Sequence, residues 1–217
     1  MIPEVDRYSY LFPNPRQASP EGLVAWGGDL NPDRVLSAYL QGIFPWYNEN
    51  DPVLWWSPDP RLVLYPKDIK ISKSLRRSMK KFDVKIDTDF EGVMRKCREV
   101  RLLKNEGTWI LEEVIESYVE IYKRGLAKSF EVYYEGELVG GLYGIDLGKI
   151  FCGESMFSTK SDASKTALVH LAHYCLENDY TLIDCQVPSD HLKRMGAVEM
   201  ERNTFLDLLE ESLQSVT

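Results

Sequence analysis

The chain of 217 residues lacks any apolar run that approaches the roughly 20 residues of a membrane-spanning helix. Its first residues, M-I-P-E-V-D-R, lack the basic-then-apolar order of a signal peptide. It also lacks a C-x-x-C pair, which disfavours a zinc ribbon and a disulfide framework. These absences predict a cytoplasmic protein with buried, reduced thiols and no membrane contact. The four cysteines are Cys97, Cys152, Cys175 and Cys185.

Histidine is scarce, with three residues in the chain. His170 and His173 lie three positions apart in a predicted helix, but no third ligand accompanies them. His191 is isolated. We therefore predict no metal site and no cofactor.

Positive charge is in the minority overall, with 26 basic against 34 acidic residues and a net charge of −8. This balance argues against unspecific nucleic-acid binding by the whole surface. The segment 67–81 is the exception, because it holds seven basic residues and one acid, a net +6 in 15 positions. Its bases recur at helical spacing, which suits either a solvated helix face or a phosphate backbone, and the single sign favours the phosphate backbone.

The first sixty residues are rich in proline, glycine and aromatic residues. One helix is clear there, because Asn31 can cap it, Pro32 suits its first turn and Gly42 suits its end. The remainder reads as turns. We predict a small N-terminal domain over 1–62 and a second domain over 63–217.

The second domain has regular patterns joined by short links, which predict an antiparallel meander and an α+β fold. A capping box at Thr88–Glu91 predicts one helix start. The predicted strands cover 62–65, 84–87, 130–134, 138–145, 149–157 and 181–186. The other predicted helices cover 72–81, 109–122, 161–177 and 205–213.

Four of the five tryptophans lie in the first domain. Trp46, held between Pro45 and Tyr47 in a turn, suits stacking against a nucleobase. Trp55 and Trp56 are as consistent with a core as with a binding surface.

Three polar residues lie in or beside apolar strands. Glu154 is either an exposed strand-end acid or an inward acid that needs a partner or a raised pKa. Alternation places Asp184 and Gln186 on one strand face, which suits a cleft and an exposed sheet face equally.

Eight segments, in this order and with this spacing, together resemble the bacterial leucyl/phenylalanyl-tRNA–protein transferases. The similarity runs from about Phe12 to Phe205. The segments are E-G-L-V-A-W-G-G-D-L (21–30), A-Y-L-Q-G-I-F-P-W-Y (38–47), L-W-W-S-P-D-P-R (54–61), G-T-W-I (107–110), L-V-G-G-L-Y-G (138–144), F-C-G-E-S-M-F-S (151–158), A-S-K-T-A-L (163–168) and L-I-D-C-Q (182–186).

The resemblance implies an N-acetyltransferase-like (GNAT-like) second domain behind a small family-specific one. It implies transfer of Leu or Phe, and Met less well, from Leu-tRNA or Phe-tRNA to proteins with an N-terminal Arg or Lys, creating a degradation signal.

Motif by motif, the resemblance also implies site residues. Trp46 and Trp109 sandwich the terminal adenosine, and Glu154, Asp184 and Gln186 form the catalytic cluster. The amino-acid pocket is formed by Leu142, Phe151, Met156, Leu168, Cys175 and Ile183. The tRNA backbone is bound by Lys73, Arg76, Arg77, Lys80 and Lys81.

Two other functions compete with this one. An acyl-CoA N-acetyltransferase usually carries a glycine-rich pyrophosphate turn, whereas the corresponding segment 158–165 holds no glycine. A non-catalytic tRNA-binding module would not require the polar cluster around Glu154. Both alternatives are less consistent with the sequence than aminoacyl transfer.

Overall fold

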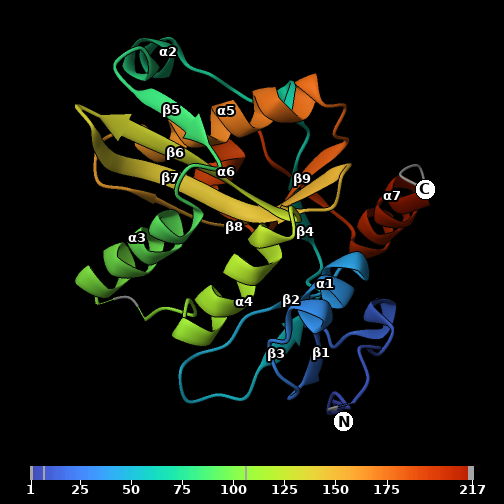
Figure 1. The fold of residues 1–217 in the computed structure, drawn as a ribbon. Helices are drawn as coiled ribbons and strands as arrows, with labels where there is room; N and C mark the ends of the chain where they lie inside the picture. Colours follow the sequence, from blue (N-terminus) through green and yellow to red (C-terminus); the bar gives the residue numbers. More distant parts are fainter. Residues whose placement is uncertain (1, 7, 106, 215–217) are drawn as a thin grey trace.

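The computed structural model describes residues 2–6, 8–105 and 107–214 and contains two β-sheets (Figure 1). The larger sheet has seven strands in the order β10-β4-β9-β8-β7-β6-β5. Its pairs are antiparallel except β8–β9, which is parallel. In sheet order the strands are β10 (Val198–Met200), β4 (Arg61–Leu64), β9 (Leu182–Gln186), β8 (Ile150–Ser158), β7 (Glu137–Asp146), β6 (Ala127–Tyr134) and β5 (Asp83–Ile86).

The smaller sheet lies in the N-terminal region and has the antiparallel order β1-β3-β2. Helix α1 (Pro32–Leu40) starts where the sequence predicts, because the Asn31 side chain accepts a hydrogen bond from the Asp33 N–H. After α1, Gly42 has a φ of 73°, which favours glycine. The strands are β1 (Leu23–Trp26), β2 (Phe44–Pro45) and β3 (Leu54–Trp56), and the 3-10 helix η1 covers Pro15–Gln17.

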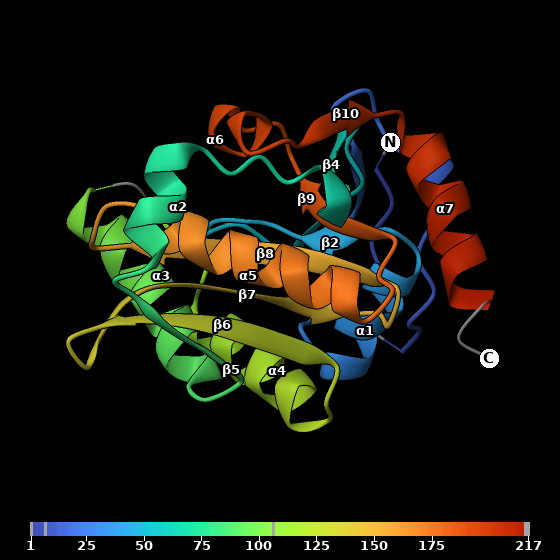
Figure 2. The ribbon, with the colours of Figure 1, turned by 90° about the horizontal axis from the view of Figure 1, so that it is seen from above.

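Helices cover both faces of the larger sheet (Figures 1 and 2). One face packs against α3 (Phe90–Leu103) and α4 (Glu112–Lys123), and the other against α5 (Ala163–Glu177). Strand alternation fixes these layers, since Tyr143 belongs to the first core and Leu142 to the second. The remaining helices are η2 (Pro66–Asp68), α2 (Lys73–Met79), α6 (Asp190–Arg194) and α7 (Arg202–Gln214).

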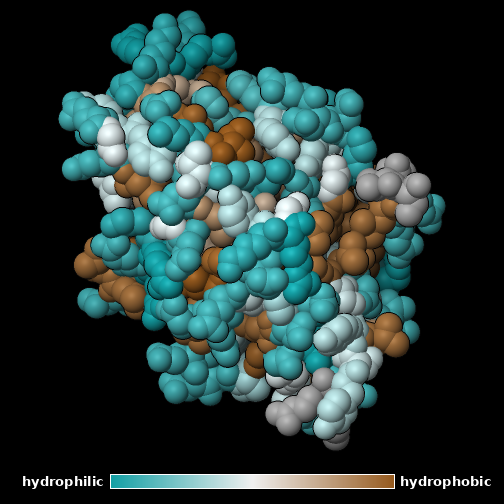
Figure 3. All heavy atoms as spheres, viewed as in Figure 1, coloured by the Kyte–Doolittle hydropathy of each residue, from teal (hydrophilic) through white to brown (hydrophobic). Residues whose placement is uncertain are grey.

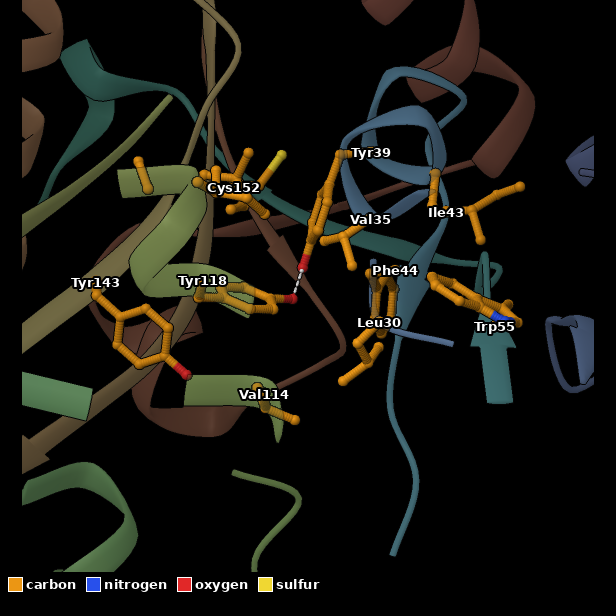
Figure 4. Close-up of a cluster of buried hydrophobic side chains, with 14 of the residues drawn as sticks. Leu30, Val35, Tyr39, Ile43, Phe44, Trp55, Val114, Tyr118, Tyr143 and Cys152 are labelled. Atoms are coloured by element: carbon orange, nitrogen blue, oxygen red, sulfur yellow. Dashed lines mark hydrogen bonds between the residues drawn. The ribbon is translucent and has the colours of Figure 1, made fainter. Parts of the chain in front are cut away.

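The small sheet, α1 and α4 share one hydrophobic core, shown in Figure 4. Trp55 is fully buried in it, and its indole N–H donates to the Gly27 carbonyl at 2.9 Å. The Tyr39 and Tyr118 hydroxyls are hydrogen-bonded at 2.7 Å across the junction. The N-terminal region is therefore packed onto the rest of the molecule through its core.

The predicted α+β class and the mostly antiparallel sheet are confirmed. The Thr88 capping box is wrong, because Asp89 caps α3 while the Thr88 hydroxyl donates to the buried Glu131. Helix α4 begins at Glu112, three residues after the predicted start. Strands β1, β2, β3 and β10 and helix α6 were not predicted. None of the helices within the described residues has the length and apolar character to cross a membrane.

Candidate functional site

A cavity of about 270 Å³ lies beside the centre of the larger sheet, between β7, β8, β9, α5 and α6. Its apolar wall contains four residues of the predicted amino-acid pocket: Leu142, Met156, Leu168 and Ile183. Its polar wall contains Glu154 and Gln186. The cavity therefore combines a hydrophobic slot with a polar end.

The other two residues of the predicted pocket, Phe151 and Cys175, lie in the core and not in the cavity wall. Phe151 packs edge-on against Phe130 at 6.3 Å between ring centroids, so it supports the sheet under the cavity. The wall includes Leu171 and Leu192, which the sequence reasoning did not assign to the site. The sequence did hold a signal for Leu171, because it follows Leu168 by three positions in a helix and therefore lies on the same helix face.

Glu154 lies at the polar end, partly shielded from water. Its Oε1 accepts a hydrogen bond from Gln186 Nε2 at 2.8 Å, and its Oε2 accepts one from the Tyr118 hydroxyl at 3.4 Å. Burial raises the pKa of Glu154 to about 8, although hydrogen bonds from Tyr39 and Gln186 oppose the shift. This carboxyl group therefore titrates close to neutral pH.

Asp184 lies beneath the polar end, fully buried and paired with the fully buried Arg61. Arg61 Nε donates to Asp184 Oδ1 at 2.9 Å and Arg61 Nη2 donates to Oδ2 at 2.7 Å, a two-pronged contact. The remaining terminal nitrogen, Nη1, donates to the Gly42 carbonyl at 3.0 Å. Both carboxylate oxygens of Asp184 are thus engaged within the protein.

The simple alternation predicted for this strand is wrong at its end. Gln186 has a φ of 65°, in the left-handed region, and its N–H donates to Asp184 Oδ1 at 2.9 Å. This turn places the Gln186 side chain in the cavity wall with Ile183 and Cys185, whereas Asp184 remains below. Asp184, which lies below the cavity wall, therefore fixes the backbone of Gln186 through this hydrogen bond.

The two predicted adenosine-binding tryptophans are placed differently. Trp46 is 47% exposed, and its carbonyl accepts a hydrogen bond from the Trp56 indole at 2.7 Å. Trp109 is 8% exposed and packs edge-on against Tyr118, the residue that contacts Glu154.

Trp109 and the neighbour of Trp46, Tyr47, both lie close to the start of α4. Trp109 comes three residues before Glu112, and the Tyr47 hydroxyl, next to Trp46, donates to Glu113.

The predicted tRNA-binding residues lie on α2 and directly after it. All five are exposed: Lys73, Arg76, Arg77, Lys80 and Lys81. Figure 3 shows the surface over α2 as hydrophilic. Leu75 is the buried anchor of this short helix, which leaves its basic side chains facing water.

Comparison with protein families gives two matches. The family described as "Leucyl/phenylalanyl-tRNA protein transferase" matches residues 63–210, and the N-terminal domain of that family matches residues 28–59. A leucyl/phenylalanyl-tRNA–protein transferase of Sulfurimonas denitrificans is 51% identical over 209 residues, covering 96% of this chain and 92% of that protein. One of Syntrophobacter fumaroxidans is 52% identical over 208 residues, covering 95% and 89%.

Solved structures are similar only at a distance. A GCN5-related N-acetyltransferase from Kribbella flavida has a TM-score of 0.39 and 11% identity, covering 75% of this chain and 58% of that one. L-PGS from Bacillus licheniformis has a TM-score of 0.42 and 15% identity, covering 62% and 48%.

Proposed function

The chain belongs to the leucyl/phenylalanyl-tRNA protein transferase family, and we propose that it transfers Leu or Phe, and Met less well, from aminoacyl-tRNA to the N-terminal Arg or Lys of acceptor proteins. The product would carry a degradation signal in the cytoplasm. The observation that carries the proposal is the cavity of about 270 Å³, apolar along one wall and bounded by Glu154 and Gln186 at the other.

The reaction joins an amine to an ester carbonyl. The acceptor α-amino nitrogen forms a C–N bond, the ester C–O bond breaks, and the 3′-terminal hydroxyl of the tRNA leaves with a proton. Because the ester is already activated, the step runs downhill without further energy input. The protein therefore has to align the two groups and remove the amine proton, and alignment alone supplies several kcal/mol.

Glu154 is the group that we propose receives this proton. An α-amino group titrates near pH 7.7–8.0, and the pKa of Glu154 is raised to about 8. Proton transfer between groups of matched pKa is nearly balanced in free energy, which suits general-base catalysis near neutral pH. As a carboxylate, Glu154 also favours a cationic Arg or Lys at the acceptor end.

Asp184, the second carboxylate of the predicted catalytic cluster, is better suited to a positioning role than to accepting the proton. Its oxygens already accept three hydrogen bonds, two from Arg61 and one from the Gln186 N–H. Asp184 is also fully buried and does not line the cavity, so a substrate amine in the cavity does not contact it directly. We propose that Asp184 orients Gln186, which in turn holds Glu154 through the 2.8 Å hydrogen bond.

The apolar wall supports the choice of amino acid. Leu142, Met156, Leu168 and Ile183 surround a slot suited to a side chain unbranched at Cβ. Val and Ile would clash near its mouth. Because apolar pockets discriminate by about 1–3 kcal/mol per methylene, Met should be used at a reduced rate.

Contacts outside the cavity would hold the tRNA. The exposed face of Trp46 suits stacking against the terminal adenine. Trp109, which the resemblance implies as the opposite partner, is buried, so the stacking is assigned to Trp46 alone. The exposed bases of α2 suit the phosphate backbone of the tRNA body.

Incubation with Leu-tRNA and an Arg-initiated peptide, followed by mass spectrometry, tests the proposal. We expect the peptide to gain one leucine residue, and an otherwise identical Ala-initiated peptide to gain none. A preference for Ile-tRNA over Leu-tRNA would contradict the proposed pocket. Acetylation of the peptide from acetyl-CoA, without leucine transfer, would instead identify an acetyltransferase.

A further inference from the structure

A second cavity, of about 510 Å³, lies next to the amino-acid pocket where the start of α2, the start of α5 and α6 meet. Figure 2 shows α2 and α6 beside α5. The cavity is lined by cationic side chains from three separate segments: Lys70 before α2, Lys165 on α5 and Arg194 on α6. Lys70 belongs to the basic segment 67–81, whereas Lys165 and Arg194 were not assigned to any site from the sequence.

The charge of this cavity is positive. Lys70, Lys165 and Arg194 contribute +3 and Asp162 contributes −1, which leaves +2 in a chain of net charge −8. Asp162 is paired with Lys165 at 2.8 Å. Lys70 and Arg194 form no ion pair among the described residues, so two cations are available to a ligand.

His191 connects the two cavities, because it lines both of them. Its Nε2 is buried and has no hydrogen-bond partner within the described part of the chain. Burial, followed by the nearby charges of Lys165 and Arg194, lowers the pKa of His191, so the ring is neutral at pH 7. The neutral ring of His191 thus lies between the amino-acid pocket and the cations of the second cavity.

We propose that this cationic cavity binds a phosphodiester of the single-stranded 3′ end of the tRNA, upstream of the terminal adenosine. The inference rests on the proposed function, which places the aminoacyl group in the first cavity and the tRNA body on α2. The cavity with Lys70 and Arg194 lies between these two sites, because it shares His191 with the amino-acid pocket and Ser74 and Leu75 with α2. Each phosphate carries a charge that two unpaired cations neutralise, with release of counterions.

The test uses Lys70→Ala and Arg194→Ala, singly and together, in the full chain. Lys193→Ala is the matched control, because Lys193 lies beside Arg194 on α6 but is paired with Glu199 at 2.6 Å and does not line the cavity. Three leucyl donors are compared: 3′-leucyl-adenosine, which has no phosphodiester, the leucylated trinucleotide CCA, and full-length Leu-tRNA.

We expect the double variant to raise KM for the leucylated trinucleotide and for Leu-tRNA by about tenfold, as for loss of charge-assisted contacts. KM for leucyl-adenosine and for the acceptor peptide should stay unchanged. The dependence of log affinity for the trinucleotide on log salt should become shallower by about 0.7 for each lost phosphate contact. The Lys193→Ala control should match the wild type throughout.

Three outcomes would overturn the inference. An equal loss with leucyl-adenosine would mean that the substitutions distort the amino-acid pocket. A loss with Leu-tRNA alone would place the cations against the tRNA body. A raised KM for an acidic acceptor peptide, with unchanged KM for the donors, would assign the cavity to the polypeptide.

A binding measurement separates this inference from the proposed function. Fluorescence anisotropy with non-acylated, labelled CCA requires no transfer. Tighter binding by the wild type than by the double variant supports the cavity even if leucine transfer fails. Equal binding by both proteins overturns the cavity even if transfer succeeds.

Discussion

Replacing Glu154 by glutamine removes an acid whose pKa is raised to about 8 and keeps the shape of the side chain. The glutamine carbonyl accepts the hydrogen bond from Gln186 Nε2, and its amide donates toward the Tyr118 hydroxyl. The variant therefore resembles the protonated enzyme but cannot ionise. Both its stability and its activity should lose a pH dependence that the wild type has.

The size of the stability effect follows from the two pKa values. In the unfolded chain Glu154 titrates near its ordinary value of 4.5, and in the folded protein near 8. As the pH rises between these values, the unfolded state releases a proton that the folded state keeps, so the wild type loses stability. Each pKa unit is worth about 1.4 kcal/mol, which gives about 3 kcal/mol at pH 7. The partial exposure of the side chain reduces this to about 2–3 kcal/mol.

Urea denaturation of the two proteins at pH 5, 7 and 9 measures this difference. Between pH 5 and pH 8 the free energy of unfolding of the Glu154→Gln protein should rise relative to that of the wild type. Above pH 8 the difference between the two free energies should be constant. A difference that does not change between pH 5 and pH 8 would refute the raised pKa of Glu154.

The activity should depend on the same carboxyl group, but it should rise with pH, whereas the stability of the wild type falls. If Glu154 accepts the proton as a carboxylate, about one tenth of the wild type is competent at pH 7 and about nine tenths at pH 9. Single-turnover transfer should therefore rise about tenfold over this range with a midpoint near pH 8. The Glu154→Gln variant should be slow at every pH, and wild-type rates in that variant would exclude Glu154 as the base.

Trp46→Ala should raise KM for Leu-tRNA by about tenfold or more, because stacking on a base is worth about 1–3 kcal/mol. It should not change the melting temperature, because Trp46 is 47% exposed. Trp56→Ala also removes packing, so it should lower the melting temperature. Asp184→Asn should cost about 3–5 kcal/mol in urea denaturation because it leaves Arg61 as an uncompensated buried charge. Its residual activity should keep a pH midpoint, displaced downward because the charge of Asp184 helps to raise the pKa of Glu154; loss of this midpoint would make Asp184 the titrating base. Leu168→Ala should enlarge the pocket and raise the kcat/KM ratio of Phe-tRNA to Leu-tRNA about fivefold, and an unchanged ratio would remove Leu168 from the selectivity wall.

Local signals made the fold partly predictable. The start of α1 depends on the Asn31 side chain and on Pro32, which lie in the helix itself or next to it. Strands β1 to β3 were missed because each has two to four residues and depends on distant partners, such as the Gly27 carbonyl for the Trp55 indole. Short strands gain their order from packing, which periodicity does not record.

The candidate site was also predictable only where the signal is local in the sequence. The sequence allowed an inward Glu154 with a raised pKa as one alternative, and its environment in the structure selects that alternative. The partner of Asp184 had no sequence signal, because Arg61 lies 123 positions away. The left-handed backbone of Gln186 was equally hidden, since a non-glycine residue seldom adopts it.

Arg61 also determines whether the larger sheet can be separated from the N-terminal region. Its guanidinium contacts Asp184 of the larger sheet and the Gly42 carbonyl of the N-terminal region, and it lies over the Phe44 ring at 4.9 Å. A fragment that begins at residue 63 would bury Asp184 without a counter-charge, so we expect this fragment to be less stable than the same residues in the whole chain. Through Arg61 the N-terminal region therefore helps to hold the strand that carries Asp184 and Gln186.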